Sequence, residues 1–173
     1  MKARDLMIPI SDCPRLAEDR NIYDAVVLLE AFRQRYDRWA YRPRGVLVHD
    51  ADFMVIGHLR HADMLRALAA HGVPATGAMP AWSSIWEQAE VWKNVLNHLH
   101  STARSVRVKE AMHVYSEMEY VDGDALLEEA LARLMAGPYL NLVVRSQKTP
   151  LGILRQSDVF ERLCRDIKLS GMH

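Results

Sequence analysis

The chain has 173 residues, half of them apolar and a quarter charged, with a formal net charge of zero. This balance argues against general nucleic-acid binding, because neutralising phosphates takes a basic surplus or a basic stripe. Only Cys13 and Cys164 are present, and neither a signal-peptide stretch nor a run of membrane-span length occurs. We therefore expect a cytoplasmic globular protein that binds neither membranes nor nucleic acids, with one sizeable core or two small ones.

The first half of the chain predicts a short extended segment, a helix, two strands and a second helix. The first helix is indicated by apolar residues at spacings of three and four, and the strands by two short apolar runs around a polar turn. Gly72 and Pro74 end the second helix. The predicted elements are a helix at 22–38, strands at 45–48 and 54–59, and a helix at 61–71.

A further helix is predicted between the two halves, from residue 85 to about residue 103. Ser84 and Glu87 have the spacing of a capping box, which predicts the start of this helix. Two interpretations stay open: the helix covers the core of this chain, or its tryptophans anchor a dimer or another partner protein. Its apolar stripe contains Ile85, Ala89, Trp92, Leu96, Leu99 and Ala103.

The second half of the chain repeats the first. Residues 46–68 align without a gap over 141–163, and residues 2–29 over 107–134. Such a repeat indicates two copies of one β-α-β-β-α unit, neither of which buries its apolar face alone. The predicted elements of the second copy are helices at 125–136 and 157–167 and strands at 141–145 and 151–154.

These patterns predict an α/β fold in which two repeats pack with pseudo-two-fold symmetry. The first repeat is expected at 1–72 and the second at 106–173. A linker at 73–105 carries the inserted tryptophan-rich helix.

Each repeat contains the pattern Gly-x-x-Arg-x-x-Asp where a strand meets a helix, at Gly57–Asp63 and at Gly152–Asp158. Glycine admits a close approach to the backbone, the first N–H groups of a helix attract an anion, and arginine binds phosphate. An acidic residue there can accept hydrogen bonds from ribose hydroxyls. The alternative is structural: the aspartates complement the helix dipoles and the glycines turn the chain.

This order of elements resembles a tandem pair of cystathionine β-synthase (CBS) domains, a Bateman module. Each such domain opens with a segment like Lys-Val-x-Asp-x-Met-Thr-Pro, matched here by Ala3–Pro9 and Val108–Val114, and closes with a Gly-to-Asp segment. The resemblance implies a stand-alone regulatory protein, not an enzyme, that binds AMP, ADP, ATP or S-adenosylmethionine in clefts between the repeats and signals by a conformational change. It implies no required cofactor, a homodimer, and a regulated partner protein.

The resemblance also implies which residues contact the ligand. Asp63 and Asp158 would hold the ribose hydroxyls beside Gly57 and Gly152. The residues that would edge the base are Ile8, Pro9, His113 and Val114, with Val48 and Val143 nearby.

The chain departs from the family pattern where the family has threonine or serine and this chain has Arg60 and Arg155. The bulky cation either adds a phosphate contact or fills the pocket. Ser157 offers a hydroxyl beside Asp158, so we expect the cleft with Asp158 to be the better ligand site. The alternative function is a CBS-pair scaffold without a ligand that serves dimerisation or partner docking.

The candidate dimer surfaces are the apolar helical faces at Val26–Phe32 and Leu127–Met135. Packing of these faces inside one chain is the alternative. No metal site is predicted, because the spacing of His58, His61 and Asp63 does not enforce a ligand shell. No catalytic residue is predicted, because the sequence contains no phosphate-binding loop, nucleophile elbow or zinc-protease motif.

Overall fold

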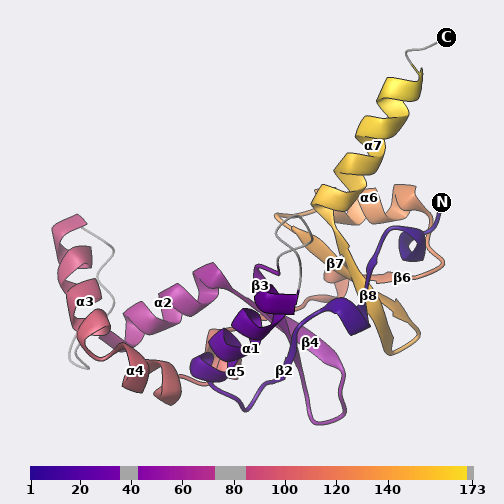
Figure 1. The fold of residues 1–173 in the computed structure, drawn as a ribbon. Helices are drawn as coiled ribbons and strands as arrows, with labels where there is room; N and C mark the ends of the chain where they lie inside the picture. Colours follow the sequence, from indigo (N-terminus) through magenta and orange to yellow (C-terminus); the bar gives the residue numbers. More distant parts are fainter. Residues whose placement is uncertain (36–42, 73–84, 171–173) are drawn as a thin grey trace. The chain divides into compact units, whose positions relative to one another are not determined.

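The computed structural model describes residues 1–35, 43–72 and 85–170, which fall into two compact units (Figure 1). Unit 1 consists of Met1–Cys13 together with Tyr115–His173, and unit 2 consists of Pro14–Val114. No helix in the described part of the chain is long and apolar enough to cross a membrane. The cap predicted at Ser84 and the predicted helix-ending residue Pro74 lie outside the described residues.

Unit 2 contains a four-stranded sheet in the order β2-β3-β4-β5. β2 (Arg15–Ala17) runs parallel to β3 (Gly45–His49), and β3 pairs antiparallel with β4 (Val55–Arg60). The edge strand β5 (His113–Val114) pairs antiparallel with β4. Valine, isoleucine and leucine suit these strands because their branched side chains pack well on a half-buried pleated surface.

Unit 1 contains a second four-stranded sheet with the same plan, in the order β6-β7-β8-β1. β6 (Tyr120–Asp122) runs parallel to β7 (Asn141–Ser146), and β7 pairs antiparallel with β8 (Thr149–Arg155). The edge strand β1 (Ile8–Pro9) pairs antiparallel with β8. The predicted α/β class is confirmed as a mixed fold with two four-stranded sheets.

The compact units divide the chain differently from the sequence repeats. β1 belongs to the opening segment of the first repeat but completes the sheet of the second, and β5 belongs to the second repeat but completes the sheet of the first. Each repeat therefore supplies the edge strand of the other repeat's sheet. The sequence could not show this exchange, because a gapless alignment reveals which segments are alike but not which segments pair.

The repeated glycines explain why these edge strands fit. A Cβ atom on Gly152 would lie 2.2 Å from the carbonyl oxygen of Ile8 and 3.0 Å from the Met7 sulfur. A Cβ atom on Gly57 would lie 2.3 Å from the carbonyl oxygen of His113. The group that approaches each glycine is thus the backbone of the edge strand, with the methionine of the opening segment beside it.

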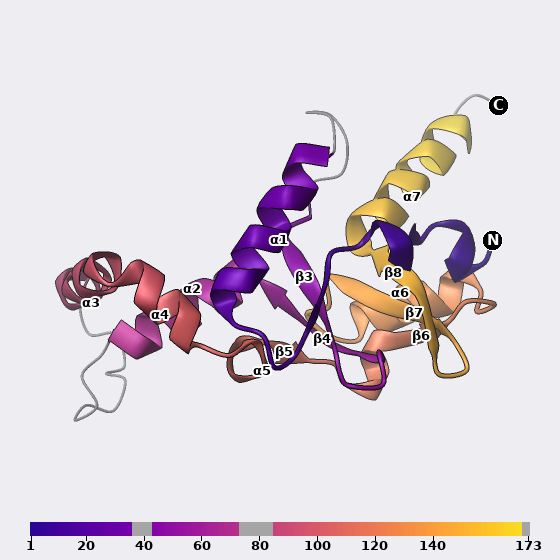
Figure 2. The same cartoon turned by 60° about the horizontal axis from the view of Figure 1, so that its bottom comes forward.

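Five helices accompany the sheet in the described part of unit 2: α1 (Ile22–Arg35), α2 (His61–Gly72), α3 (Ile85–Asn97), α4 (Leu99–Ser105) and α5 (Val108–Ala111). Figure 2 shows α3 and α4 beside α2. Apolar side chains on these helices and on β3 and β4 form the core of the unit. Its buried members are Ile22, Ala25, Leu29, Val46, Val48, Leu59, Met64, Leu68, Val95, Ala103, Val106 and Val108.

The tryptophan-rich segment is two helices rather than one, so the prediction of a continuous helix to Ala103 is wrong. His98 has φ −125° and ψ 22°, outside the helical region, and separates α3 from α4. Val95 and Ala103, on either side of this break, both belong to the core of unit 2. Tertiary packing therefore decides where the helix ends. The described part of the segment covers the core of its own unit, as the first interpretation proposed.

Two longer helices accompany the sheet of unit 1: α6 (Leu127–Met135) and α7 (Gln156–Ser170). α7 begins directly where β8 ends and is the yellow helix of Figure 1. The core of this unit is smaller. Its buried members are Ala3, Val121, Ala130, Leu134, Leu142, Val144, Leu154 and Val159.

Candidate functional site

The Gly-to-Asp segment of unit 1 spans the junction between β8 and α7. Arg155 is the last residue of β8, and Asp158 lies in the first turn of α7. The Arg155 guanidinium donates two hydrogen bonds to the Asp158 carboxylate, one from Nε to Oδ2 at 2.6 Å and one from Nη2 to Oδ1. The Asp158 side chain nevertheless stays 19% exposed. This carboxylate is held at the surface by one arginine.

The corresponding junction of unit 2 lies between β4 and α2, and its carboxylate is held more completely. Asp63 Oδ2 accepts hydrogen bonds from the Arg60 backbone N–H and from Arg60 Nε, both at 2.9 Å. Asp63 Oδ1 accepts hydrogen bonds from Arg60 Nη2 and from Arg66 Nη1, both at 3.1 Å. The Asp63 side chain is only 8% exposed.

The pKa of the Asp63 carboxyl is lowered below its ordinary value. Burial of the carboxyl would raise this pKa, but hydrogen bonds from the Arg60 side chain and backbone, together with the charges of Arg60 and His58, outweigh burial. Asp63 is therefore a charged group that its neighbours hold in the ionised state.

Strand register determines which side chains share the sheet face opposite the core of unit 1. Val143 of β7 lies opposite Tyr120 of β6 and Ile153 of β8, and Ile153 lies opposite Ile8 of β1. Residues directly opposite one another share a face, so these side chains form a row across the sheet. Leu154, next to Ile153, points into the core instead. We call Tyr120, Val143, Ile153 and Ile8 the unit 1 row.

The same positions in unit 2 carry different side chains. Leu47 of β3 lies opposite Arg15 of β2 and His58 of β4, and His58 lies opposite His113 of β5. The rings of His58 and His113 are 4.8 Å apart between centroids. We call Arg15, Leu47, His58 and His113 the unit 2 row. The unit 1 row is aromatic and aliphatic, whereas the unit 2 row is largely basic.

The equivalence of Val48 and Val143 in the gapless alignment is wrong. Val48 lies opposite Gly57, and the residue opposite Gly152 is Val144. The connection between the two strands is one residue longer in unit 2, and a shift of one residue moves a side chain to the other face of a sheet. Val48 therefore lies in the core of unit 2. Leu47 is the residue that corresponds to Val143.

The structure brings together some of the predicted ligand-contacting residues. Ile8 and His113 lie in the two rows, each within its own unit. Pro9 and Val114 are exposed on the edge strands, opposite the two glycines. Ser157 is exposed in the first turn of α7, next to Asp158.

Sequence reasoning missed Tyr120 and Ile153 in unit 1 and Leu47 and His58 in unit 2. Alternation along the strand was the available signal, since Ile153 and Arg155 lie on one face of β8 and Leu154 lies on the other. Tyr120 had no such signal, because β6 has only three residues.

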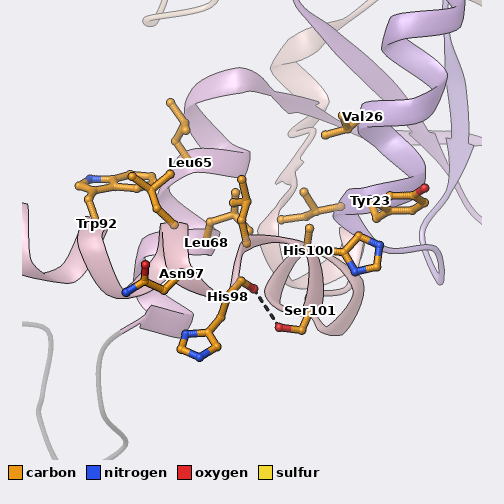
Figure 3. A pocket seen from close by; sticks show the side chains of 13 residues that line it. Tyr23, Val26, Leu65, Leu68, Trp92, Asn97, His98, His100 and Ser101 are labelled. Atoms are coloured by element: carbon orange, nitrogen blue, oxygen red, sulfur yellow. Dashed lines mark hydrogen bonds between the residues drawn. The ribbon is translucent and has the colours of Figure 1, made fainter.

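Unit 2 also contains an apolar groove of about 860 Å³ among α1, α2, α3 and α4 (Figure 3). Leu65 and Trp92 lie at one end of the view, and Tyr23 and His100 at the other. The rings of Tyr23 and His100 pack edge to face at 5.3 Å, and the Arg104 guanidinium lies 4.4 Å from the centre of the Tyr23 ring. Several leucine and valine side chains at the groove are exposed: Val26, Leu65, Leu96 and Leu99.

Among the described residues, no group of three or more histidine, cysteine, aspartate or glutamate side chains could hold a metal ion. Cys13 is buried and Cys164 half-buried, and neither forms a disulfide within the described residues.

Comparison with known proteins agrees with this arrangement. Residues 108–165 match the family model of the CBS domain. No curated protein matches the chain in sequence.

The fold is similar to solved structures over nearly the whole chain. A CBS domain-containing protein of unknown function from Kribbella flavida has a TM-score of 0.67 at 17% identity, covering 95% of this chain and 98% of that protein. The CBS-pair protein CBSX2 from Arabidopsis thaliana has a TM-score of 0.62 at 18% identity, covering 96% of each chain. The structure of CBSX2 in complex with AMP has a TM-score of 0.62 at 21% identity, covering 95% of this chain and 97% of that one.

These findings define the class of protein by its fold. The chain has the fold of CBS-pair proteins, and its residues 108–165 match the CBS domain.

Proposed function

We propose that this chain is a regulatory CBS-pair protein without catalytic activity that binds an adenosine-type ligand and signals by a conformational change. The observation that carries the proposal is the Asp158 carboxylate in the first turn of α7, directly after β8, the strand that contributes Ile153 to the unit 1 row. Asp158 accepts two hydrogen bonds within the described part of the chain, both from Arg155. A carboxylate can accept about four, so the vicinal hydroxyls of a ribose find acceptor positions there.

The unit 1 row suits the base of such a ligand. Tyr120 and Ile8 are half-buried and offer an aromatic and an aliphatic side chain against which an adenine ring loses water favourably, next to the buried Val143 and Ile153. Arg155 ends β8 on the face that carries this row, because it lies two residues after Ile153. Its guanidinium can turn toward a phosphate while Asp158 accepts the ribose hydroxyls. This arrangement favours AMP, ADP or ATP over S-adenosylmethionine, which has no phosphate.

The crystallised complex of CBSX2 with AMP supports this ligand class, because that protein shares the fold over nearly its whole length. A ligand can change the conformation only if it contacts two states differently. Transfer of Arg155 from Asp158 to a ligand phosphate supplies such a difference, since the ion pair exists only without the ligand.

The test is thermal unfolding with AMP, ADP, ATP and S-adenosylmethionine, followed by calorimetric titration with the best ligand. A ligand at a hundred times its Kd stabilises the folded state by about 2.7 kcal/mol, which raises Tm by several degrees. Asp158→Ala is expected to abolish this shift. The matched control is Asp166→Ala, two turns further along α7, where the carboxylate pairs with Arg162. An unchanged Tm of the wild type with all four ligands contradicts the proposal.

We further propose that the protein is a homodimer formed through apolar helix faces and acts on a separate regulated protein. Val26 and Val27 on α1 are 51% and 50% exposed, and Met135 at the end of α6 is 62% exposed. Burying such side chains against a second copy removes apolar surface from water. Light scattering after size-exclusion chromatography is expected to give twice the 19.8 kDa chain mass. A mass of one chain that persists at high concentration contradicts the dimer.

The second candidate function is a CBS-pair scaffold without a ligand. The observation that favours it is that an arginine already occupies each aspartate, Arg60 on Asp63 and Arg155 on Asp158. The apolar groove of unit 2 would then be the surface for dimerisation or partner docking (Figure 3). Leu96→Glu, which places a charge at this groove, would change the assembly state under this alternative. Under the ligand-sensor proposal, Leu96→Glu leaves nucleotide binding unchanged.

A further inference from the structure

The two aspartates that could hold a ribose differ in how many acceptor positions remain. Asp63 accepts four hydrogen bonds, from the Arg60 backbone, twice from the Arg60 guanidinium, and from Arg66. A carboxylate accepts about four, so Asp63 has its full set of donors. Asp158 accepts two, both from Arg155.

Within the described residues, Asp63 has a second arginine donor and Asp158 does not, and this difference comes from a single position of the repeat. Arg66 lies three residues after Asp63 and donates to it from the next turn of α2. The residue three positions after Asp158 is Glu161, which pairs instead with Arg165 at 2.7 Å. A glutamate cannot donate to a carboxylate at neutral pH, so Asp158 receives no second side-chain donor from its own helix.

The side chains of the two rows also favour ligand binding at unit 1 over unit 2. Where unit 1 places Ile153 beside Ile8, unit 2 places His58 beside His113. A purine base gains more from burial against isoleucine side chains than against imidazoles, which keep their own requirement for hydrogen bonds.

We propose that an adenosine-type ligand binds only at Asp158 of unit 1, one molecule per chain, and that Arg66 closes the equivalent position at Asp63 of unit 2. This inference rests on the proposed function. To bind a ribose at Asp63, a ligand must displace two arginines from a buried carboxylate. At Asp158 it competes with one arginine for a carboxylate that is partly exposed.

The first test is calorimetric titration of the full chain with AMP. One equivalent per chain is expected, with binding lost in Asp158→Asn and retained in Asp63→Asn. Two equivalents, one of them removed by Asp63→Asn, overturn the inference and leave the proposed function intact. If the wild type binds none of AMP, ADP, ATP and S-adenosylmethionine, the proposed function and the inference both fail.

The second test transfers the arginine to unit 1. Glu161 is exposed, so Glu161→Arg is expected to fold normally, which the Tm without ligand checks. The new guanidinium stands where Arg66 stands in unit 2 and is expected to weaken AMP binding about tenfold by occupying Asp158. Glu161→Gln is the matched control, because it removes the ion pair with Arg165 without adding a donor of comparable charge and reach. AMP affinity in Glu161→Arg equal to that of Glu161→Gln overturns the role given to Arg66.

Discussion

Unit 1 and unit 2 have the same strand order and the same glycine-to-aspartate junction, yet they carry different side chains around that junction. In unit 2 a buried Asp63 is held by Arg60 and Arg66. In unit 1 Arg155 is the one side chain among the described residues that holds Asp158, and this carboxylate remains partly exposed. The comparison teaches that the shared backbone geometry depends on the glycines and edge strands, whereas the capacity to bind a ligand depends on a few side chains.

The largest effect is expected from the glycines, which the two units share. Gly152→Val and Gly57→Val place a Cβ within 2.2 Å and 2.3 Å of a carbonyl oxygen of the edge strand. The edge strand must move, so each substitution is expected to cost about 3 kcal/mol of unfolding free energy. Urea unfolding measures this loss, with the exposed Ser157→Ala as the control. If either valine variant is as stable as the control, the close approach of the edge strand does not hold that unit together.

The next largest effect is the loss of unfolding free energy when each aspartate is removed, which is expected to differ between Asp63 and Asp158. Asp63→Ala leaves Arg60 and Arg66 without their shared buried acceptor and is expected to cost about 2 kcal/mol. Asp158→Ala removes a more exposed pair and is expected to cost about 1 kcal/mol or less. Urea unfolding of both variants tests the difference in burial. Equal losses would show that the two carboxylates are held alike.

Exchange of one row residue tests whether the base binds on unit 1. Ile153→His gives unit 1 the residue that unit 2 has at this position and is expected to weaken AMP binding about tenfold, or about 1.4 kcal/mol. The reciprocal variant His58→Ile is expected to leave AMP affinity unchanged. Calorimetric titration compares the two, and weakened binding in His58→Ile would place a ligand on unit 2 instead.

The smallest effect is the pH dependence that comes from Asp63. Its pKa is lower in the folded protein than in the unfolded chain, where an aspartate has a pKa of about 3.9. The unfolded state therefore binds more protons near that pH. Asp63 stabilises the fold above about pH 4, and this stabilisation disappears as the pH falls through the folded-state pKa. Unfolding measured from about pH 6 to pH 3 should show a steeper loss for the wild type than for Asp63→Asn. Parallel curves would contradict the lowered pKa.

Several features were predictable from the sequence because they are local. Apolar spacing predicted α1, α2 and α7 to within a few residues of their described ends. Short apolar runs predicted β3, β4, β7 and β8. The repeated glycine and aspartate correctly marked both strand-to-helix junctions. The break at His98 was not predictable, because the stripe from Trp92 to Ala103 keeps helical spacing through it.

The alignment of the repeats paired Val48 with a residue that is not its structural equivalent. Its identity with Val143 indicated equivalence, but the longer connection in unit 2 shifts the register by one residue and turns Val48 into the core. Identity between two short valine-rich strands carries little information about register, because the neighbouring residues are equally apolar.

The sequence by itself determined the two copies of the α/β unit, their element order and the positions of the two aspartates, since these follow from patterns within short windows. Only the tertiary structure decided that β1 completes the sheet of the second repeat and β5 that of the first. It also decided that Arg60 and Arg155 pair with the two aspartates, and that Arg66 adds a donor to Asp63. The reason is physical: strand pairing joins segments far apart in the chain, and the direction of a long arginine side chain depends on burial and on the acceptors that folding places around it.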